Sequence, residues 1–214
     1  MRQIFVFLAI TTIFLLLLPN MGLASIMNGN FETGDLTFWS TSGPGNVSVA
    51  MDGSNHYALM QAGFDPQSGE FITRLSQDFS IPIHAPSLKF DFLFGTTGPD
   101  PTAIFIDALT VSLLTSKGNL IDFLIVDDLG MILDPLATVS ASSVFLGGKT
   151  LTLDLSGFTV ADATLLFDLW DEDDSANSTA KIDNVNVVPE PGTIVLFGSG
   201  LVGLFGLRKR WLKI

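Results

Sequence analysis

The stretch Leu88-Lys89-Phe90-Asp91-Phe92-Leu93-Phe94 alternates apolar and polar side chains over most of its length. A period of two places the apolar side chains on one face of a β-strand and the polar ones on the other. A strand with one apolar face needs a second layer of structure to cover that face. The stretch therefore predicts a β-strand in a layered, all-β structure.

Similar segments occur on both sides of this stretch. They are rich in Val, Ile, Phe and Thr, and Gly, Pro, Asp and Ser separate them. These segments are residues 46–51, 56–61, 75–81, 109–115, 120–126, 151–155, 163–170 and 181–187. Residues 139–146 are either a further strand or a segment that covers a loop. Spacings of about 8–12 residues favour an antiparallel sandwich over βαβ units. We predict one β-sandwich domain over residues 25–187.

The predicted domain is strongly acidic. The whole chain has ten basic and 22 acidic residues, and five basic residues and one acid lie outside residues 25–187. The domain therefore keeps five basic and 21 acidic residues, a net charge of −16. Such a domain repels nucleic acid and attracts cations. The chain has no cysteine, which excludes cysteine catalysis and cysteine-ligated zinc.

The N-terminus has the pattern of a secretory signal peptide. Met1-Arg2-Gln3 gives a short positive region, residues 4–18 are apolar, and Gly22-Leu23-Ala24 offers small residues for cleavage. We expect a signal peptide over residues 1–24 and a mature chain that starts at Ser25. The alternative is an uncleaved N-terminal membrane anchor.

The C-terminus, residues 188–214, has three parts in sequence. Pro189-Glu190-Pro191 comes first, residues 193–207 contain no charged side chain, and Arg208-Lys209-Arg210 follows. Roughly 15 residues of helix span about 22 Å, which is short for a bilayer core of about 30 Å. Thinning of the bilayer accommodates such a helix. We predict a transmembrane helix at about 193–207 with the basic cluster 208–210 on the cytoplasmic side. The alternative is a buried C-terminal helix.

These three parts resemble the PEP-CTERM sorting signal in both order and spacing. The resemblance implies that an exosortase, a membrane-embedded cysteine peptidase, recognises the tail and cleaves it near the Pro-Glu-Pro. It implies export across the inner membrane, transient anchoring there, and a final place at the cell surface or outside the cell. Pro189, Glu190, Pro191, Arg208, Lys209 and Arg210 are the predicted sorting residues.

Two short motifs bracket the predicted domain. Residues 28–39 read Asn-Gly-Asn-Phe-Glu-Thr-Gly-Asp-Leu-Thr-Phe-Trp, and residues 181–187 read Lys-Ile-Asp-Asn-Val-Asn-Val. Together they resemble the opening and closing strands of galactose-binding-like jelly rolls, the architecture of many carbohydrate-binding modules. The resemblance implies a jelly-roll β-sandwich and a binding function directed at polysaccharide.

In that family, the Glu of the first motif and the Asp of the last strand often hold a structural Ca²⁺. The resemblance carries this role to Glu32 and Asp183. Calcium prefers several oxygen ligands, and two converging carboxylates repel each other unless a cation lies between them. In the alternative interpretation, Glu32 caps a turn and Asp183 accepts backbone hydrogen bonds.

Trp170 is the candidate ligand-binding aromatic residue. It ends an apolar segment and adjoins the acidic run Asp171-Glu172-Asp173-Asp174. That run is either a solvated loop or a second cation site. It is no EF-hand, because Ala176 and Ile182 stand where that motif needs Gly and Glu.

The sequence favours a non-catalytic protein. Its only histidines are His56 and His84, and no Gly-x-Ser-x-Gly motif is present. We therefore expect an exported surface or matrix protein that binds extracellular polysaccharide. Two alternatives stay open: a hydrolase that uses a pair of carboxylates about 5–10 Å apart, and a purely structural or adhesive protein.

Overall fold

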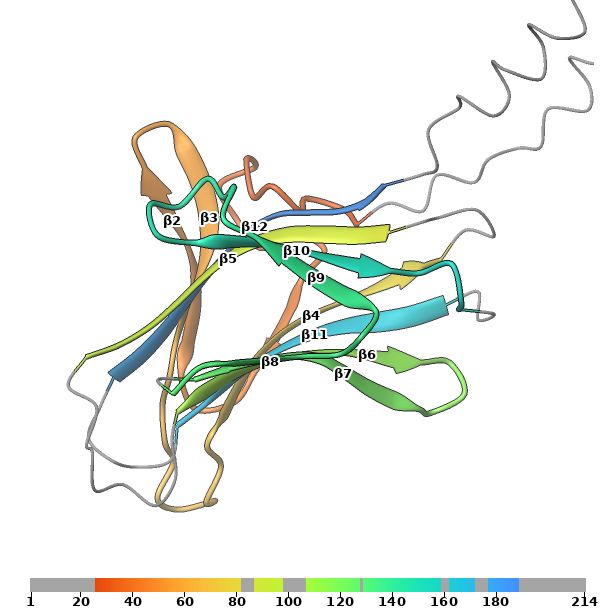
Figure 1. Ribbon diagram of the computed structural model, residues 1–214. Coiled ribbons are helices and arrows are strands. Elements are labelled where there is room, and N and C mark those ends of the chain that lie inside the picture. The colour runs from red at the N-terminus through yellow and green to blue at the C-terminus, as the bar shows by residue number, and fades with distance from the viewer. Residues whose placement is uncertain are drawn as a thin grey trace, which may run out of the picture.

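The computed structural model describes residues 26–81, 87–97, 107–127, 129–158, 162–171 and 177–188. They form two six-stranded antiparallel sheets packed face to face (Figure 1). In spatial order, the first sheet contains β1 (Ser40–Ser42), β4 (Ile72–Ser80), β11 (Asp162–Trp170), β6 (Ala108–Thr115), β7 (Leu120–Asp127) and β8 (Met131–Leu133). The second contains β2 (Asn46–Asp52), β3 (Asn55–Gln61), β12 (Asn177–Val188), β5 (Ser87–Thr97), β10 (Lys149–Asp154) and β9 (Ala137–Ser140). The chain crosses repeatedly between the sheets, which confirms the predicted jelly-roll β-sandwich.

The apolar residues of the alternating pattern that predicts β5 are the ones that the strand buries. Leu88, Phe90 and Phe92 are buried in the core between the sheets, and Lys89 lies on the outer face. The Phe90 ring meets the Phe167 ring of β11 edge-on, with 5.1 Å between centroids. Burying each such side chain contributes about 1.5–3 kcal/mol. The core that joins the sheets is therefore largely aromatic and aliphatic.

Residues 28–39 form a loop that closes one side of the sandwich. Trp39 packs against Phe31 and donates its Nε1–H to the carbonyl oxygen of Asn28 at 3.1 Å. The Val185 amide donates to the Gly29 carbonyl oxygen at 2.8 Å, next to a bulge in β12 between Asp183 and Asn186. The first and last motifs of the domain are therefore in direct contact.

The described chain begins and ends at the same end of the sandwich (Figure 1). Gln77 of β4 fixes the beginning, because its side chain exchanges two hydrogen bonds with the Met27 backbone, at 2.7 and 2.9 Å. β12 ends at Val188, which pairs with Ser87 of β5.

All the strands expected from alternation are present, with small shifts at their ends. Residues 139–146 divide between the two expected conformations: β9 covers Ala137–Ser140, and irregular chain follows. The signal peptide and the predicted helix at 193–207 lie outside the described residues. Among the residues that the structure describes, no helix is long and apolar enough to cross a membrane.

Candidate functional site

Asp183 lies on β12 in a buried polar network on the outer side of the second sheet. Its side chain is fully buried. One oxygen accepts the Asn184 backbone amide at 2.6 Å, and the other accepts Asn55 Nδ2 at 2.9 Å. Asp91 stands opposite on β5, where it accepts Asn184 Nδ2 at 2.9 Å and the Thr150 hydroxyl. The backbone hydrogen bond expected in the alternative interpretation of Asp183 is therefore present.

Glu32 lies nearby in the loop that docks onto β12, and it pairs with a histidine. Its two carboxylate oxygens contact the His56 backbone amide and the His56 Nδ1, each at 3.1 Å. The pKa of Glu32 is lowered, first by the backbone hydrogen bond from His56 and then by the imidazole. His56 thus orients the carboxylate that the sequence predicts as a calcium ligand.

The electrostatics around Asp183 suit a cation. Burial raises the pKa of Asp183, and the negative charges of Asp91 and Glu32 raise it further, against its hydrogen bonds from Asn55 and Asn184. A hard cation such as Ca²⁺ would relieve this excess of negative charge, and the site offers it oxygen ligands. The described residues nevertheless contain no group of three acidic or imidazole side chains arranged to hold a metal ion. Backbone and amide oxygens would have to complete the coordination.

One such amide oxygen lies in the same loop as Glu32. The Oδ1 atom of Asn28 is buried and has no hydrogen-bond partner among the described residues. Asn28 Nδ2 donates instead to the carbonyl oxygens of Asp35 and Thr37, at 2.9 and 3.4 Å. A buried acceptor without a donor is costly, and a bound cation would satisfy it.

Trp170 ends β11 at the opposite end of the sandwich from Val188, and it is half-buried. Its ring packs on Phe71 with 5.4 Å between centroids, and its Nε1 is buried without a partner among the described residues. A pocket of about 290 Å³ adjoins this pair. We call it the Arg74 pocket; Ser42, Gly43, Gly69, Glu70, Phe71 and Arg74 line it.

The cation of the Arg74 pocket is fixed by Asp168. Arg74 donates through Nε and one terminal nitrogen to the two Asp168 oxygens, at 2.6 and 2.7 Å. The Asp168 side chain is 8% exposed and that of Arg74 is 39% exposed. The two hydrogen bonds that Arg74 donates to Asp168 raise the pKa of Arg74. The pair therefore holds a guanidinium in a defined orientation in the lining of the pocket.

Replacing Arg74 with methionine is expected to destabilise the domain, because Asp168 would remain buried without its cation. Breaking a buried pair costs about 3–5 kcal/mol, and solvent around the exposed arginine reduces this to about 2 kcal/mol here. Thermal denaturation should show a fall in Tm of about 4–8 °C. The double variant Arg74→Met/Asp168→Leu should recover most of that loss. Equal stability of Arg74→Met and the wild-type protein would contradict this account.

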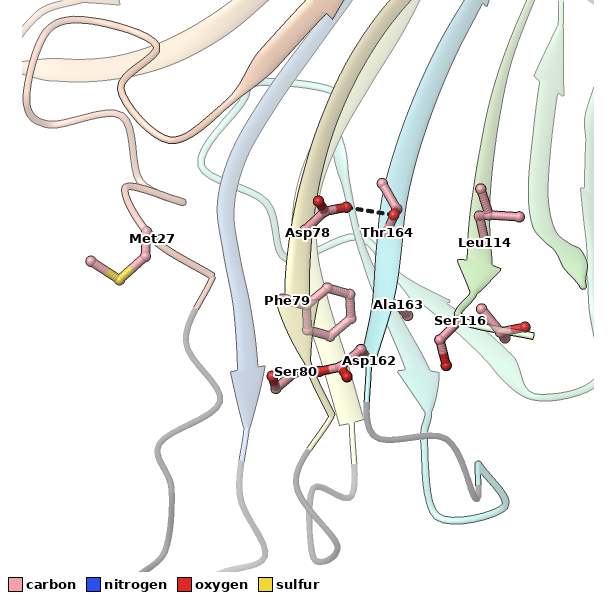
Figure 2. A pocket seen from close by; sticks show the side chains of 10 residues that line it. Met27, Asp78, Phe79, Ser80, Leu114, Ser116, Asp162, Ala163 and Thr164 are labelled. Atoms are coloured by element: carbon pink, nitrogen blue, oxygen red, sulfur yellow. Dashed lines mark hydrogen bonds between the residues drawn. The ribbon is translucent and has the colours of Figure 1, made fainter. Parts of the chain in front are cut away.

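A larger depression of about 570 Å³ lies on the outer face of the first sheet, at the end where the chain enters (Figure 2). In Figure 2, Asp78 and Thr164 face each other across β4 and β11, with a hydrogen bond of 2.6 Å. Ser80 similarly donates to Asp162 at 2.8 Å. Both carboxylates are exposed, so neither lies in the apolar surroundings that a general acid of glycoside hydrolysis needs.

The remaining predicted site residues lie outside the described ranges. These are Pro189, Glu190, Pro191, Arg208, Lys209 and Arg210 of the tail, together with most of the acidic run 171–174. His56, Asp91 and Arg74 also belong to the two sites, and no sequence motif indicates them. The fact that Arg74 is the only arginine of an acidic domain is a signal that could have indicated its role.

Comparison with known proteins identifies the tail. Residues 187–210 match the PEP-CTERM protein-sorting motif, which begins within the last residues of β12. The chain therefore carries this motif, and the motif indicates an exported protein. No curated protein matches the chain.

Three solved structures that contain carbohydrate-binding modules are similar to this chain. A family 28 module specific for non-crystalline cellulose is 14% identical, with a TM-score of 0.43 over 76% of this chain and 93% of that one. A family 27 module described for mannan recognition is 11% identical, with a TM-score of 0.39 over 73% and 91%. Clostridium thermocellum xylanase 10B, in a form that holds a family 22 module and a catalytic module with xylohexaose, is 11% identical. Its TM-score is 0.40, over 78% of this chain and 29% of that one.

Proposed function

We propose that this protein is an exported, non-catalytic β-sandwich that an exosortase releases from the inner membrane to the cell surface or the extracellular matrix. The sorting motif at residues 187–210 carries the proposal, because it begins within the last two residues of β12 and so joins the domain without a linker. Only a few residues separate Val188 from the apolar run, so the domain would be held close to the membrane until cleavage. Mass spectrometry of the released protein should find a C-terminus between residues 188 and 192. Recovery of the intact tail, ending at Ile214, would contradict processing.

The proposed task of the released domain is to bind extracellular polysaccharide. Support comes from the end of the first sheet where β4 begins and β11 ends, because an aromatic pair, Phe71 and Trp170, adjoins the Arg74 pocket there. Aromatic faces together with a few fixed polar groups are the usual elements of a small-molecule site. Trp170 is the residue that we propose to support ligand binding.

We also propose a structural Ca²⁺ that links Glu32 to Asp183, and hence the first motif to the last strand. A ligand that binds only the folded state at a hundredfold excess over its Kd stabilises by about 2.7 kcal/mol. For a domain of this size, chelation should then lower Tm by about 5–10 °C, and added Ca²⁺ should restore it. Asp183→Ala and Asp183→Asn should both abolish the response. The hypothesis would be wrong if chelator left Tm unchanged and elemental analysis found no metal in the protein.

The Asp183→Asn variant separates the metal from the hydrogen bonds. Because the pKa of Asp183 is raised on folding, the native state holds this proton more tightly than the unfolded state does. Without metal, stability should therefore fall as pH rises from the unfolded pKa through the folded one. Asparagine at position 183 carries no titratable proton, so it removes this loss of stability at high pH. Its side-chain oxygen can still accept the hydrogen bond from the Asn184 amide. In chelator at neutral pH, its Tm should equal or exceed that of the wild-type protein.

A further inference from the structure

The Arg74 pocket combines three features that point to a ligand. The first is a guanidinium that is oriented before any ligand arrives. Arg74 is the only arginine between residues 25 and 188, and Asp168 binds it through two hydrogen bonds. Because only two of its N–H groups face Asp168, the others are available to donate in a fixed geometry.

The second feature is an aromatic wall. Phe71 lines the pocket, and its ring centroid is 5.4 Å from that of Trp170, which is not among the lining residues. The Phe71 carbonyl oxygen also accepts the Asp171 amide at 2.8 Å, which fixes the backbone of this residue. An aromatic ring held in this way offers an apolar surface at little cost in conformational entropy.

The third feature is the small size of the pocket, together with the close approach of the Gly43 backbone to β4. The pocket volume of about 290 Å³ is at the lower limit of ligand sites, which run from about 300 Å³. Gly43 brings the chain so close to β4 that an added Cβ would lie 1.8 Å from the Ile72 carbonyl oxygen. Ser42 and Glu70 add a hydroxyl and a carboxylate to the lining. A compact, polar ligand with one apolar face fits this arrangement.

We propose that the Arg74 pocket binds one neutral sugar unit of a polysaccharide, with Phe71 against the sugar ring and Arg74 and Glu70 on its hydroxyl groups. The inference rests on the proposed function and names its site and ligand class. Asp168 already balances the charge of Arg74, and Glu70 adds a negative charge in a domain of net charge −16. An acidic sugar would therefore be repelled. Trp170 acts through Phe71 as a positioning residue.

Affinity electrophoresis of the full chain tests this proposal. The chain is run in a polyoxyethylene detergent, which carries no sugar, through gels that contain hydroxyethylcellulose, galactomannan, alginate or no polymer. At least one of the two neutral polymers should retard the wild-type chain, and the acidic polymer alginate should not. Phe71→Ala should weaken retardation about tenfold in apparent Kd. Phe38→Ala, which removes an exposed phenylalanine that does not line the pocket, should leave it unchanged.

The outcomes separate the site from the function. Retardation by a neutral polymer that Phe71→Ala leaves intact would overturn the pocket but keep polysaccharide binding. Retardation by alginate, alone or together with a neutral polymer, would overturn the neutral ligand class. A chain that no polymer retards would overturn both the inference and the binding part of the proposed function. Circular dichroism of Phe71→Ala distinguishes loss of binding from loss of folding; if that variant is unfolded, Glu70→Gln, at an exposed position, takes its place with the same expectation.

Discussion

A chain with alanines at Pro189, Glu190 and Pro191 is expected to stay in the inner membrane and to be absent from the extracellular fraction. The physical reason is that the proposed exosortase would lose its recognition element, whereas the apolar run at residues 193–207 would still partition into the bilayer. The expected effect is close to complete loss of release. Immunoblots of inner-membrane and extracellular fractions would measure it.

Pro135→Ala is the matched control, since it removes a proline from a turn of the domain and leaves the tail untouched. It should be released as the wild-type protein is. Release of the triple-alanine variant at wild-type levels would show that the sorting motif does not direct processing in this protein.

Replacing Gly29 with alanine is expected to destabilise the domain more than any other single substitution considered for it. A Cβ at this position would lie 1.9 Å from the Val185 carbonyl oxygen and 2.9 Å from the Val185 carbonyl carbon. Neither backbone can retreat easily, because the Val185 amide donates to the Gly29 carbonyl oxygen and Val185 is buried in the core. Overpacking usually costs about 1–3 kcal/mol, and a clash between backbones belongs at or above the upper limit. Tm should fall by about 10 °C or more.

Gly95→Ala provides the control for this experiment. Gly95 lies in β5, its backbone does not need a positive φ, and an added Cβ would meet nothing within 4 Å. Its alanine variant should melt within a few degrees of the wild-type protein. If the Gly29→Ala and Gly95→Ala variants have the same Tm, the loop 28–39 does not dock on β12 in solution.

The sequence predicts the strands well because their signal is local. In β5 the alternation of Phe90, Asp91 and Phe92 reports directly which side of the sheet each residue faces. β1 and β8 were missed because each has only three residues, too few for a period of two to be recognised. β1 also consists entirely of exposed Ser and Thr, so its sequence has no apolar residue that would indicate a buried face.

The polar sites could be predicted only in part, because their members are distant in sequence. Arg74 and Asp168 are 94 positions apart, and Asn55 and Asp183 are 128 positions apart. A single sequence contains no signal that pairs such residues. Glu32 and Asp183 were named through a family resemblance, yet the hydrogen bonds from His56 to Glu32 were not foreseen. The sorting motif, by contrast, is contiguous, so sequence alone was sufficient to recognise it.

The position of β12 determines when the second sheet can be completed during synthesis. This strand is the last to be synthesised, yet it lies in the interior of its sheet, hydrogen-bonded to β3 on one side and β5 on the other. Until residues 177–188 emerge, β2 and β3 are separated from β5, β10 and β9, and pairings over such long sequence distances form slowly. The tail emerges immediately afterwards. Completion of the fold and emergence of the sorting motif are therefore nearly simultaneous. A chain that lacks β12 would be left with two half-sheets and open edges.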